Sequence, residues 1–292
     1  MSDERVIDLE KWVEKARQDQ VQYLERQATE IVLTAIGGSP ELGKKLFLKG
    51  GILMGVAYGS PRQTADLDFS TSLPVTEDVG ERIKQALDLE LPRVAARLGL
   101  PQLICAVQSI KQKPTSKRFL KFDFPALEVK IGYALRGTQQ EKKLRARKAS
   151  MVIDVEISFN EPLDSVEIVK LDSDGMLGVY SLYDLFAEKF RALLQQEIRD
   201  RHRRQDVYDI AHLLKHFKLN QEECTKILKN FIKKCEAREI FPAVDSIDSQ
   251  ELKRRAKEDW NSMNLELDEL PDFEHCFEDV RAFYKSWPWS KV

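Results

Sequence analysis

The sequence has few cysteines, no long apolar run and almost no net charge, and each absence excludes a class of protein. Its four cysteines are scattered and form no C-x-x-C pair, which argues against a zinc ribbon and a disulfide framework. No apolar run approaches the ~20 residues that a membrane span needs. Residues 1–12 are acidic and lack the apolar core of a secretory signal. We therefore expect a cytoplasmic protein without a membrane partner.

The composition is that of a globular protein with a sizeable core. Among 292 residues, 42% are hydrophobic, which suits one large domain or two modest ones. The 46 Lys and Arg nearly balance the 48 Asp and Glu, giving a formal net charge of −2. This balance excludes a polybasic protein, although local basic patches still permit a nucleic-acid substrate. The four histidines show neither a metal-binding nor a triad arrangement.

The apolar pattern changes along the chain. We expect helices at 5–36, 52–58 and 78–98, and strands at 46–48, 65–70, 102–110, 119–123, 127–135 and 150–159. Beyond Ser181 strand signals nearly vanish, and we expect helices at 181–198, 204–217, 221–235, 249–263 and 273–285. We place the boundary near 165–180, around the turn-like residues 172–175. The fold class is therefore α+β, with a mixed α/β domain over 1–170 and a helical domain over 171–292.

Two acidic residues stand on one predicted strand, in the sequence ADLDFS. Asp66 and Asp68 are two residues apart, so their side chains point to the same face. Two such carboxylates repel each other unless a cation lies between them, and Mg²⁺ prefers oxygen ligands of this kind. The alternative is a solvated strand face beside a turn.

A second acidic strand follows in MVIDVEIS. Asp154 and Glu156 again share one face, while Ile153, Val155 and Ile157 share the other. A third carboxylate beside a D-x-D pair is what two-metal phosphoryl transfer requires. The alternative is an amphipathic edge strand, and the residues leave open which of the two acids would bind metal.

A double glycine separates a predicted strand from a predicted helix. Gly50 and Gly51 follow Lys49, and residues without a side chain let the backbone pass close to a ligand. The helix that follows offers free N–H groups to a phosphate. Taken alone, the pair is also compatible with a simple turn.

Two features of the C-terminal half suggest anion binding. Lys189 interrupts the apolar stripe of its predicted helix, and an inward-facing lysine needs an anion, unless it snorkels at the margin. Residues 199–204 are rich in arginine and precede Asp206 and Asp209, which stand at helical i, i+3 spacing. Arginines suit the phosphates of a nucleotide or RNA; the alternative is a solvated helix entry.

In this order, the motifs resemble those of the AbiEii/AbiGii toxin family, nucleotidyltransferases of the DNA polymerase β superfamily that include the MenT toxins. The run FLKGGILMGVAYGSPRQTADLDFS (47–70) is similar to the first family motif. VEISFNEP (155–162) resembles the strand with the third acid, and DLFAEKFRALLQQ (184–196) resembles the lysine helix. RRQDVYDI (203–210) resembles the Arg-Asp-x-x-Asp motif, although Gln205 separates Arg204 from Asp206 where many members have Arg directly before Asp.

The resemblance implies a polymerase-β-type nucleotidyltransferase core with a mixed sheet, plus a C-terminal helical domain. It also implies transfer of a nucleoside monophosphate from an NTP, with Mg²⁺ or Mn²⁺ as cofactor. The protein would be the toxin of a toxin–antitoxin or phage-defence pair, with a cognate antitoxin as partner and tRNA as the expected acceptor. The implied catalytic residues are Asp66, Asp68, Glu156, Lys189 and Asp206, of which Asp66, Asp68 and Glu156 bind metal, with Asp154 as the alternative to Glu156. The implied nucleotide-binding residues are Lys49, Gly50, Gly51, Arg62, Thr64, Lys189 and Arg204.

Two other functions stay open from the sequence. One is a nucleotidyltransferase that modifies a small molecule, such as an antibiotic. The other is a catalytically inactive module that binds nucleotides or another protein. The basic segments 142–148 and 199–204 would supply phosphate contacts to an RNA acceptor, or they are a solvated loop and helix end.

Overall fold

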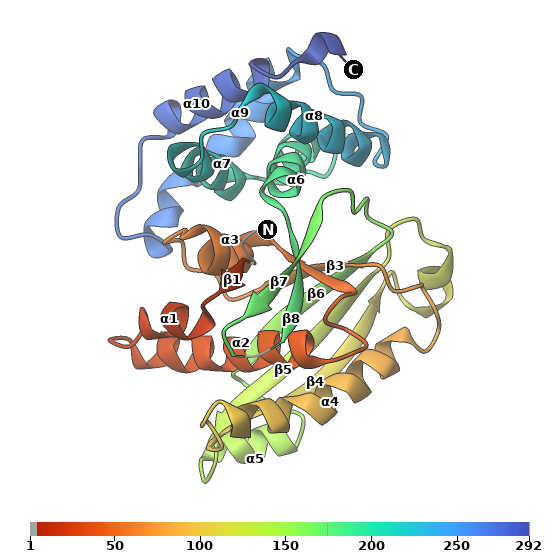
Figure 1. Cartoon of the computed structure of the whole chain (residues 1–292), viewed down its shortest axis with the longest axis vertical. Helices are drawn as coiled ribbons and strands as arrows, with labels where there is room; N and C mark the ends of the chain where they lie inside the picture. The colour runs from red at the N-terminus through yellow and green to blue at the C-terminus, as the bar shows by residue number, and fades with distance from the viewer. Residues whose placement is uncertain (1–4, 174, 292) are drawn as a thin grey trace. The chain divides into compact units, whose positions relative to one another are not determined.

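The computed structural model describes residues 5–173 and 175–291. The chain forms two compact units (Figure 1). The first unit contains the residues up to Ala57, Thr64–Glu161 and Val166–Val179. The second contains Tyr58–Gln63, Pro162–Ser165 and the chain from Tyr180 onward. The chain therefore passes into the second unit twice, briefly, before it stays there.

The first unit is built on one mixed eight-stranded sheet, in the order β1-β7-β8-β2-β3-β6-β5-β4. The pairs β1/β7, β2/β8 and β3/β6 are parallel, and β2/β3, β4/β5 and β5/β6 are antiparallel. The strands are β1 (Val6–Ile7), β2 (Leu46–Lys49), β3 (Leu67–Thr71), β4 (Leu103–Lys113), β5 (Ala126–Leu135), β6 (Val152–Phe159), β7 (Val166–Leu171) and β8 (Met176–Tyr180).

The two faces of this sheet differ in polarity because side chains alternate along each strand. Leu67, Phe69 and Val155 point to one face and are buried. Helices α2 (Gln20–Gly38) and α4 (Val79–Arg97) pack against each other and cover this apolar face (Figure 1). The opposite face carries the acidic residues of β3 and β6. The fold is thus α+β with a mixed sheet, as the sequence predicts.

Helix α5 (Gln139–Arg145) packs on the polar face at the far end of β5. A Cβ added to Gly132 of β5 would lie only 2.6 Å from Ala149 and 2.7 Å from Leu144. Gly132 is an even number of residues from Lys130 and Glu128 on β5, whose side chains point to the polar face. A side chain at Gly132 would therefore point to the same face, which is the face that α5 covers. The sequence pattern of this region predicts only a basic stretch and not the helix that the structure shows.

The expected single helix over 5–36 is wrong. The segment forms β1, then α1 (Leu9–Glu14), then α2. The side chain of Asp8 accepts from the backbone N–H of Lys11, and that of Asp19 accepts from the N–H of Val21 at 2.9 Å. Each aspartate therefore starts a new helix by capping it, although the apolar spacing continues through both positions.

One other expectation for the first unit is also wrong, and two of its strands are missed. The expected strand at 119–123 is a 3₁₀ turn, η1 (Ser116–Lys121), in which the Phe119 ring packs edge-on against Phe159 at 5.8 Å. Strands β7 and β8, which belong to the main sheet, are not among the strands that the sequence predicts, and they lie on either side of the expected turn at Asp172. Helix α3 (Gly50–Tyr58) follows β2 as expected.

The second unit is helical, and most of its helices lie where the sequence predicts them. The exception is 249–263: α9 ends at Lys257, and the 3₁₀ turn η3 begins after Asp259, whose φ of 56° is left-handed. Aromatic rings fill the core: the centroid of the Phe190 ring lies 4.8 Å from that of Trp287 and 5.5 Å from that of Tyr284. The helices are α6 (Leu182–Gln195), α7 (Arg204–His216), α8 (Gln221–Glu236), α9 (Gln250–Lys257) and α10 (Phe273–Lys285), with η2 (Ser246–Asp248), η3 (Trp260–Leu265) and η4 (Trp289–Lys291).

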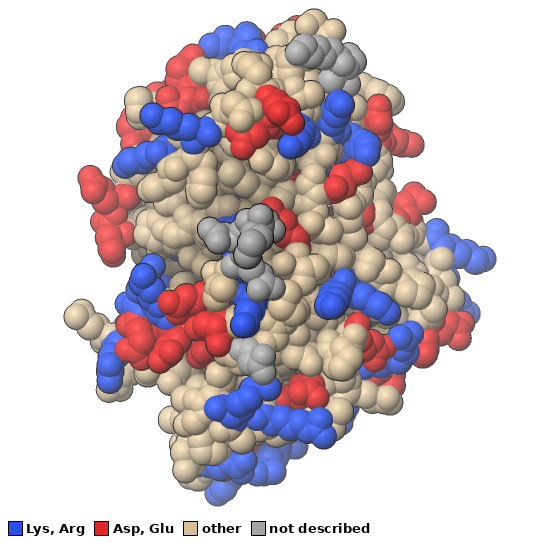
Figure 2. All heavy atoms as spheres, in the orientation of Figure 1, with Lys and Arg blue, Asp and Glu red and all other residues tan. Residues whose placement is uncertain are grey.

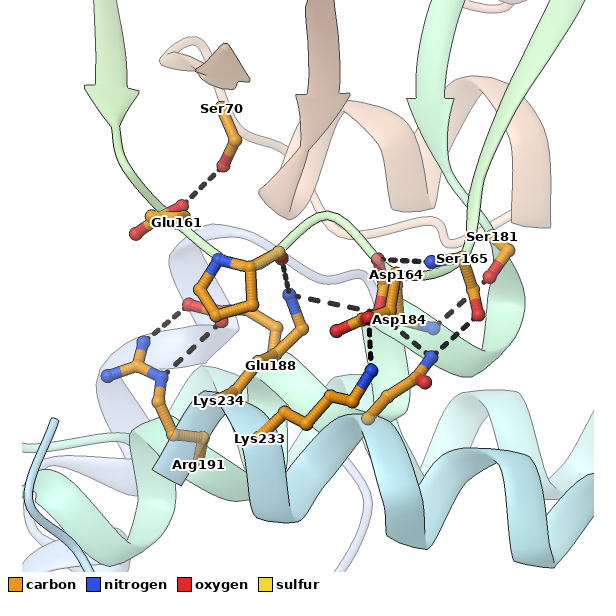
Figure 3. A network of polar contacts seen from close by, with 12 residues as sticks. Ser70, Glu161, Asp164, Ser165, Ser181, Asp184, Glu188, Arg191, Lys233 and Lys234 are labelled. Atoms are coloured by element: carbon orange, nitrogen blue, oxygen red, sulfur yellow. Dashed lines mark hydrogen bonds and ion pairs between the residues drawn. The ribbon is translucent and has the colours of Figure 1, made fainter. Parts of the chain in front are cut away.

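A buried polar network ties the short segment Pro162–Ser165 to α6 and α8 (Figure 3). The Lys234 ammonium donates to the carbonyl of Pro162 at 3.0 Å and lies 3.7 Å from the Asp184 carboxylate. Asn230 donates to Asp184 at 3.0 Å and to the Ser165 hydroxyl at 2.8 Å. Because these groups satisfy one another, the charges tolerate burial. Throughout the described ranges, no helix is both long and apolar enough to cross a membrane.

Candidate active site

A row of four carboxylates lies on the polar face of β3 and β6. Asp68 is directly opposite Glu156 in the parallel pairing of the two strands. Asp66 and Asp154 lie two residues before Asp68 and Glu156, Asp66 just before β3 and Asp154 within β6. Directly opposite residues of paired strands point to the same face. Tertiary structure thus brings together the two acidic pairs that the sequence predicts, 88 residues apart at Asp68 and Glu156.

The acids in this row are not electrostatically equivalent. Burial and the neighbouring Asp154 raise the pKa of Asp66, and Lys130 only partly offsets this. Lys130 forms an ion pair with Asp154, with the ammonium 2.9 Å from the carboxylate. Asp154 therefore already has a cation beside it on β5.

The backbone at Gly50 lies against the Asp68 carboxylate. A Cβ built on Gly50 would be 2.3 Å from the Oδ2 atom of Asp68, and the φ of Gly50 is +72°. Any other residue at this position would meet both a steric clash and backbone strain. Gly50 also begins α3, with Gly51 next to it, and the half-buried Thr64 lies just before β3. The glycine therefore lets the start of α3 approach the acidic row.

Lys49 also lies on the polar face, because it is paired with Asp68 in the antiparallel register of β2 and β3. Its ammonium forms an almost buried ion pair with Glu161, and the Ser70 hydroxyl donates to the same carboxylate (Figure 3). Glu161 is not among the site residues that the sequence predicts. The only local signal is its place just after β6, following Asn160, whose φ of 59° turns the chain.

The second unit holds a buried cluster centred on Lys189 of α6. The Lys189 ammonium donates to Asp209 at 2.6 Å and to Asp206 at 3.2 Å, and Lys189 is only 5% exposed. Burial acts to lower the pKa of Lys189, but the two aspartates outweigh it and the pKa is raised. Burial acts to raise the pKa of Asp209, but Lys189 and Arg62 outweigh it and the pKa is lowered. The cluster therefore keeps its ionic form in the interior.

Arg62 belongs to the same cluster. Its guanidinium donates to the two oxygens of Asp209 at 3.2 and 3.3 Å and to Glu266 at 2.9 Å. Gln205 donates to Glu266 at 3.1 Å. Arg62, which the sequence predicts to bind nucleotide, is thus held by two carboxylates. These carboxylates belong to Asp209 and Glu266, which are not among the predicted site residues.

Arg204, the first residue of α7, has a different environment. Its Nε atom is buried and makes no hydrogen bond, and we find no ion pair for its guanidinium among residues 5–173 and 175–291. The neighbouring Arg203 lies 3.8 Å from Asp206. A buried donor without a partner is costly. Arg204 is therefore suited to receive an anion.

The carboxylate row supplies oxygen donors, the ligand type that Mg²⁺ prefers. In the part of the chain described, no three His, Cys, Asp or Glu side chains converge as a complete metal site. This is compatible with Mg²⁺, which is commonly held by one or two carboxylates together with water and substrate phosphates. Asp68 and Glu156, opposite each other, fit that incomplete set.

Comparisons with known proteins agree with this architecture. MenT4, a nucleotidyltransferase toxin from Mycobacterium tuberculosis H37Rv, superposes with a TM-score of 0.59 at 16% identity, covering 97% of this chain and 91% of that one. JHP933 from Helicobacter pylori gives a TM-score of 0.51 at 16% identity, covering 91% of each chain. At this identity the two structures show the fold alone. No curated protein is similar enough in sequence to count as a match.

The sequence itself matches a protein-family model over most of its length. The model is described as "Nucleotidyl transferase AbiEii toxin, Type IV TA system", and it covers residues 32–283. This range includes the acidic row of the first unit and the Lys189 cluster of the second. The chain belongs to the AbiEii family of nucleotidyltransferase toxins.

Proposed function

We propose that this nucleotidyltransferase uses a divalent metal, Mg²⁺ or Mn²⁺, to transfer a nucleoside monophosphate from an NTP to tRNA. The observation that supports this most directly is the register of β3 and β6, with Asp68 opposite Glu156 and Gly50 against Asp68. Carboxylates from two adjacent strands, approached closely by a glycine at the start of a helix, suit a metal-bound triphosphate.

Asp66, Asp68 and Glu156 are the proposed metal ligands. We prefer Glu156 to Asp154 as the third acid because Glu156 faces Asp68, whereas Asp154 is paired with Lys130. When bound, the metal neutralises the charge of the triphosphate and of the transition state.

The proposed reaction is an in-line displacement at the α-phosphorus. An acceptor hydroxyl oxygen bonds to this phosphorus and its proton passes to solvent water, while the bond to the bridging oxygen breaks and pyrophosphate leaves. Lys49, Gly50, Gly51 and Thr64 of the first unit are the proposed triphosphate-binding residues. The resemblance to the AbiEii family assigns charge compensation to Lys189 and Arg204. Asp206 holds the Lys189 ammonium at 3.2 Å and is assigned to orient it. Catalysis would rest on positioning and charge stabilisation.

The biological role proposed here is that of a toxin acting in the cytoplasm as part of a phage-defence pair. The family description, a type IV toxin–antitoxin system, supports a cognate antitoxin as partner. The choice of tRNA rests on the resemblance to the MenT toxins.

A transfer assay tests this proposal. The protein would be incubated with Mg²⁺ and each α-labelled NTP, with and without total tRNA, beside the variants Asp68→Ala and Glu167→Ala. We expect label on tRNA with the wild-type protein and with Glu167→Ala, a carboxylate on β7, and none with Asp68→Ala. Label that reaches only small molecules would replace the tRNA acceptor with a small one. Full transfer by Asp68→Ala would refute the proposed metal site.

A further inference from the structure

A concentration of unpaired positive charge lies on α5 and the turn that follows it, in the first unit. We call Lys142, Lys143, Arg147 and Lys148 the α5 basic surface. All four are exposed, and within the described ranges none forms an ion pair or side-chain hydrogen bond. The neighbouring Arg145, by contrast, is paired with Glu141. Figure 2 shows Lys and Arg side chains gathered where Figure 1 places α5.

Arg147 occupies a position at which the backbone favours glycine. Its φ is +56°, and the turn is closed by hydrogen bonds from Lys148 N–H to the Lys143 carbonyl at 2.8 Å and from Arg147 N–H to the Leu144 carbonyl at 3.0 Å. This is the left-handed residue of a helix C-terminal cap, where a side chain costs stability. An exposed, unpaired arginine at a strained backbone position suggests a function for its charge.

Arg147 also lines a cavity of about 650 Å³ at the β4 edge of the sheet. The walls combine cations, among them Lys111, with uncharged polar groups such as Ser109 and Gln112. Acidic residues are present too: Glu128 is paired with Lys113, while Glu77 and Glu81 stand near the start of α4. The cavity therefore offers hydrogen-bonding groups beside the basic surface.

The α5 basic surface lies on the same face of the sheet as the acidic row. Glu128 of β5 is directly opposite Glu156, and α5 packs over Gly132, four residues further along β5. At ~3.3 Å per residue, this places the two features about 13 Å apart along the strand. Both belong to the first unit, so one extended ligand can reach both.

We infer that the α5 basic surface binds the phosphate backbone of the RNA whose end receives the nucleotide. The inference rests on the proposed function. RNA fits better than an acidic protein because it carries evenly spaced phosphates along one strand, and because bases and riboses find amide and hydroxyl partners in the adjoining cavity.

The first test removes the charge. The variant K142Q/K143Q/R147Q/K148Q would be compared with K218Q/K226Q/K229Q/K257Q, which removes four exposed lysines from the second unit. For the α5 variant we expect at least about tenfold weaker tRNA binding, and a plot of log affinity against log salt that is shallower by about 3. The control variant should bind tRNA as the wild type does.

A second test separates charge from folding. Arg147→Gly removes the cation but relieves the positive φ, so thermal stability should hold or rise while RNA affinity falls. Arg147→Lys should retain RNA affinity. RNA affinity unchanged in Arg147→Gly and in the quadruple variant would overturn the inference.

Two further outcomes distinguish this inference from the proposed function. Asp68→Ala should bind tRNA normally and transfer nothing, which separates binding from chemistry. If the wild type transfers no label to RNA although the quadruple variant loses RNA binding, the transfer proposal fails and the surface stands. If the quadruple variant keeps tRNA binding but loses binding of poly-glutamate, the surface serves an acidic protein and the inference is wrong.

Discussion

Lys189 and Asp209 form an ion pair of 2.6 Å between two side chains that are almost completely buried. Asp209 also receives Arg62, so one carboxylate stabilises two cations in the interior. Such a cluster contributes to stability only while it is complete, because each charge has lost its hydration.

Removal of Asp209 should therefore destabilise the second unit strongly. Asp209→Ala leaves Arg62 and Lys189 without their shared partner, and we expect a loss of about 3–5 kcal/mol in the free energy of unfolding. Urea denaturation followed by circular dichroism measures this loss. Asp206→Ala is the control, since Asp206 is more exposed and Lys189 would keep Asp209; a similar loss in both variants would contradict this account.

Replacement of Gly50 by alanine should damage activity more than folding. The new Cβ would displace the Asp68 carboxylate, and a misplacement of about 1 Å at a catalytic group can cost 10²-fold in rate. Gly99→Ala is a matched control because Gly99 has the same φ of +72° but nothing within 4 Å of an added Cβ. Both variants bear the strain of the positive φ, and Gly50→Ala adds the clash with Asp68, so Gly50→Ala should lose at least as much stability as Gly99→Ala. Only Gly50→Ala should lose nucleotide transfer. Equal activity in the two variants would show that the contact with Asp68 is unimportant.

Stability should depend on pH through Glu30 of α2. Glu30 is 7% exposed, and burial together with Asp172 and Glu10 raises its pKa to about 7. Between pH ~4.5 and ~7 the native state keeps the Glu30 proton while the unfolded state has lost it. The free energy of unfolding is therefore highest, as far as Glu30 is concerned, below pH ~4.5, and it falls as the pH rises toward 7. At pH 8, Glu30→Gln should be more stable than the wild type by about 2–3 kcal/mol, from thermal denaturation. The two proteins should converge near pH 4.5, and a constant difference across this range would exclude the explanation.

The cysteines should be unreactive in the folded protein. All four, Cys105, Cys224, Cys235 and Cys276, are buried. Burial raises the pKa of Cys105 and of Cys235 to about 12, so the reactive thiolate is scarce. Titration with a thiol reagent at pH 7.5 should label four groups rapidly in denaturant and none at that rate in the native state. Rapid labelling of one native cysteine would reveal local opening around it.

Several elements were predictable because their signals are local. The apolar spacing of α4, α6, α7, α8 and α10 repeats over several turns, and their observed bounds lie close to the predicted ones. The segment 5–36 shows the limit of this signal. Its apolar spacing continues across Asp8 and Asp19, yet both residues cap helices, because a short polar side chain competes for the backbone N–H groups.

The sequence alone determined the family and the α+β class, because the runs of motifs and the helical periodicity are both local in the chain. Only the tertiary structure decided which residues meet. Glu161 meets Lys49, and Arg62 meets Asp209, across 112 and 147 residues. It also decided that α5 lies on the face that carries Asp68. These relationships depend on strand register and packing, and register is set by contacts between distant segments that no local pattern records.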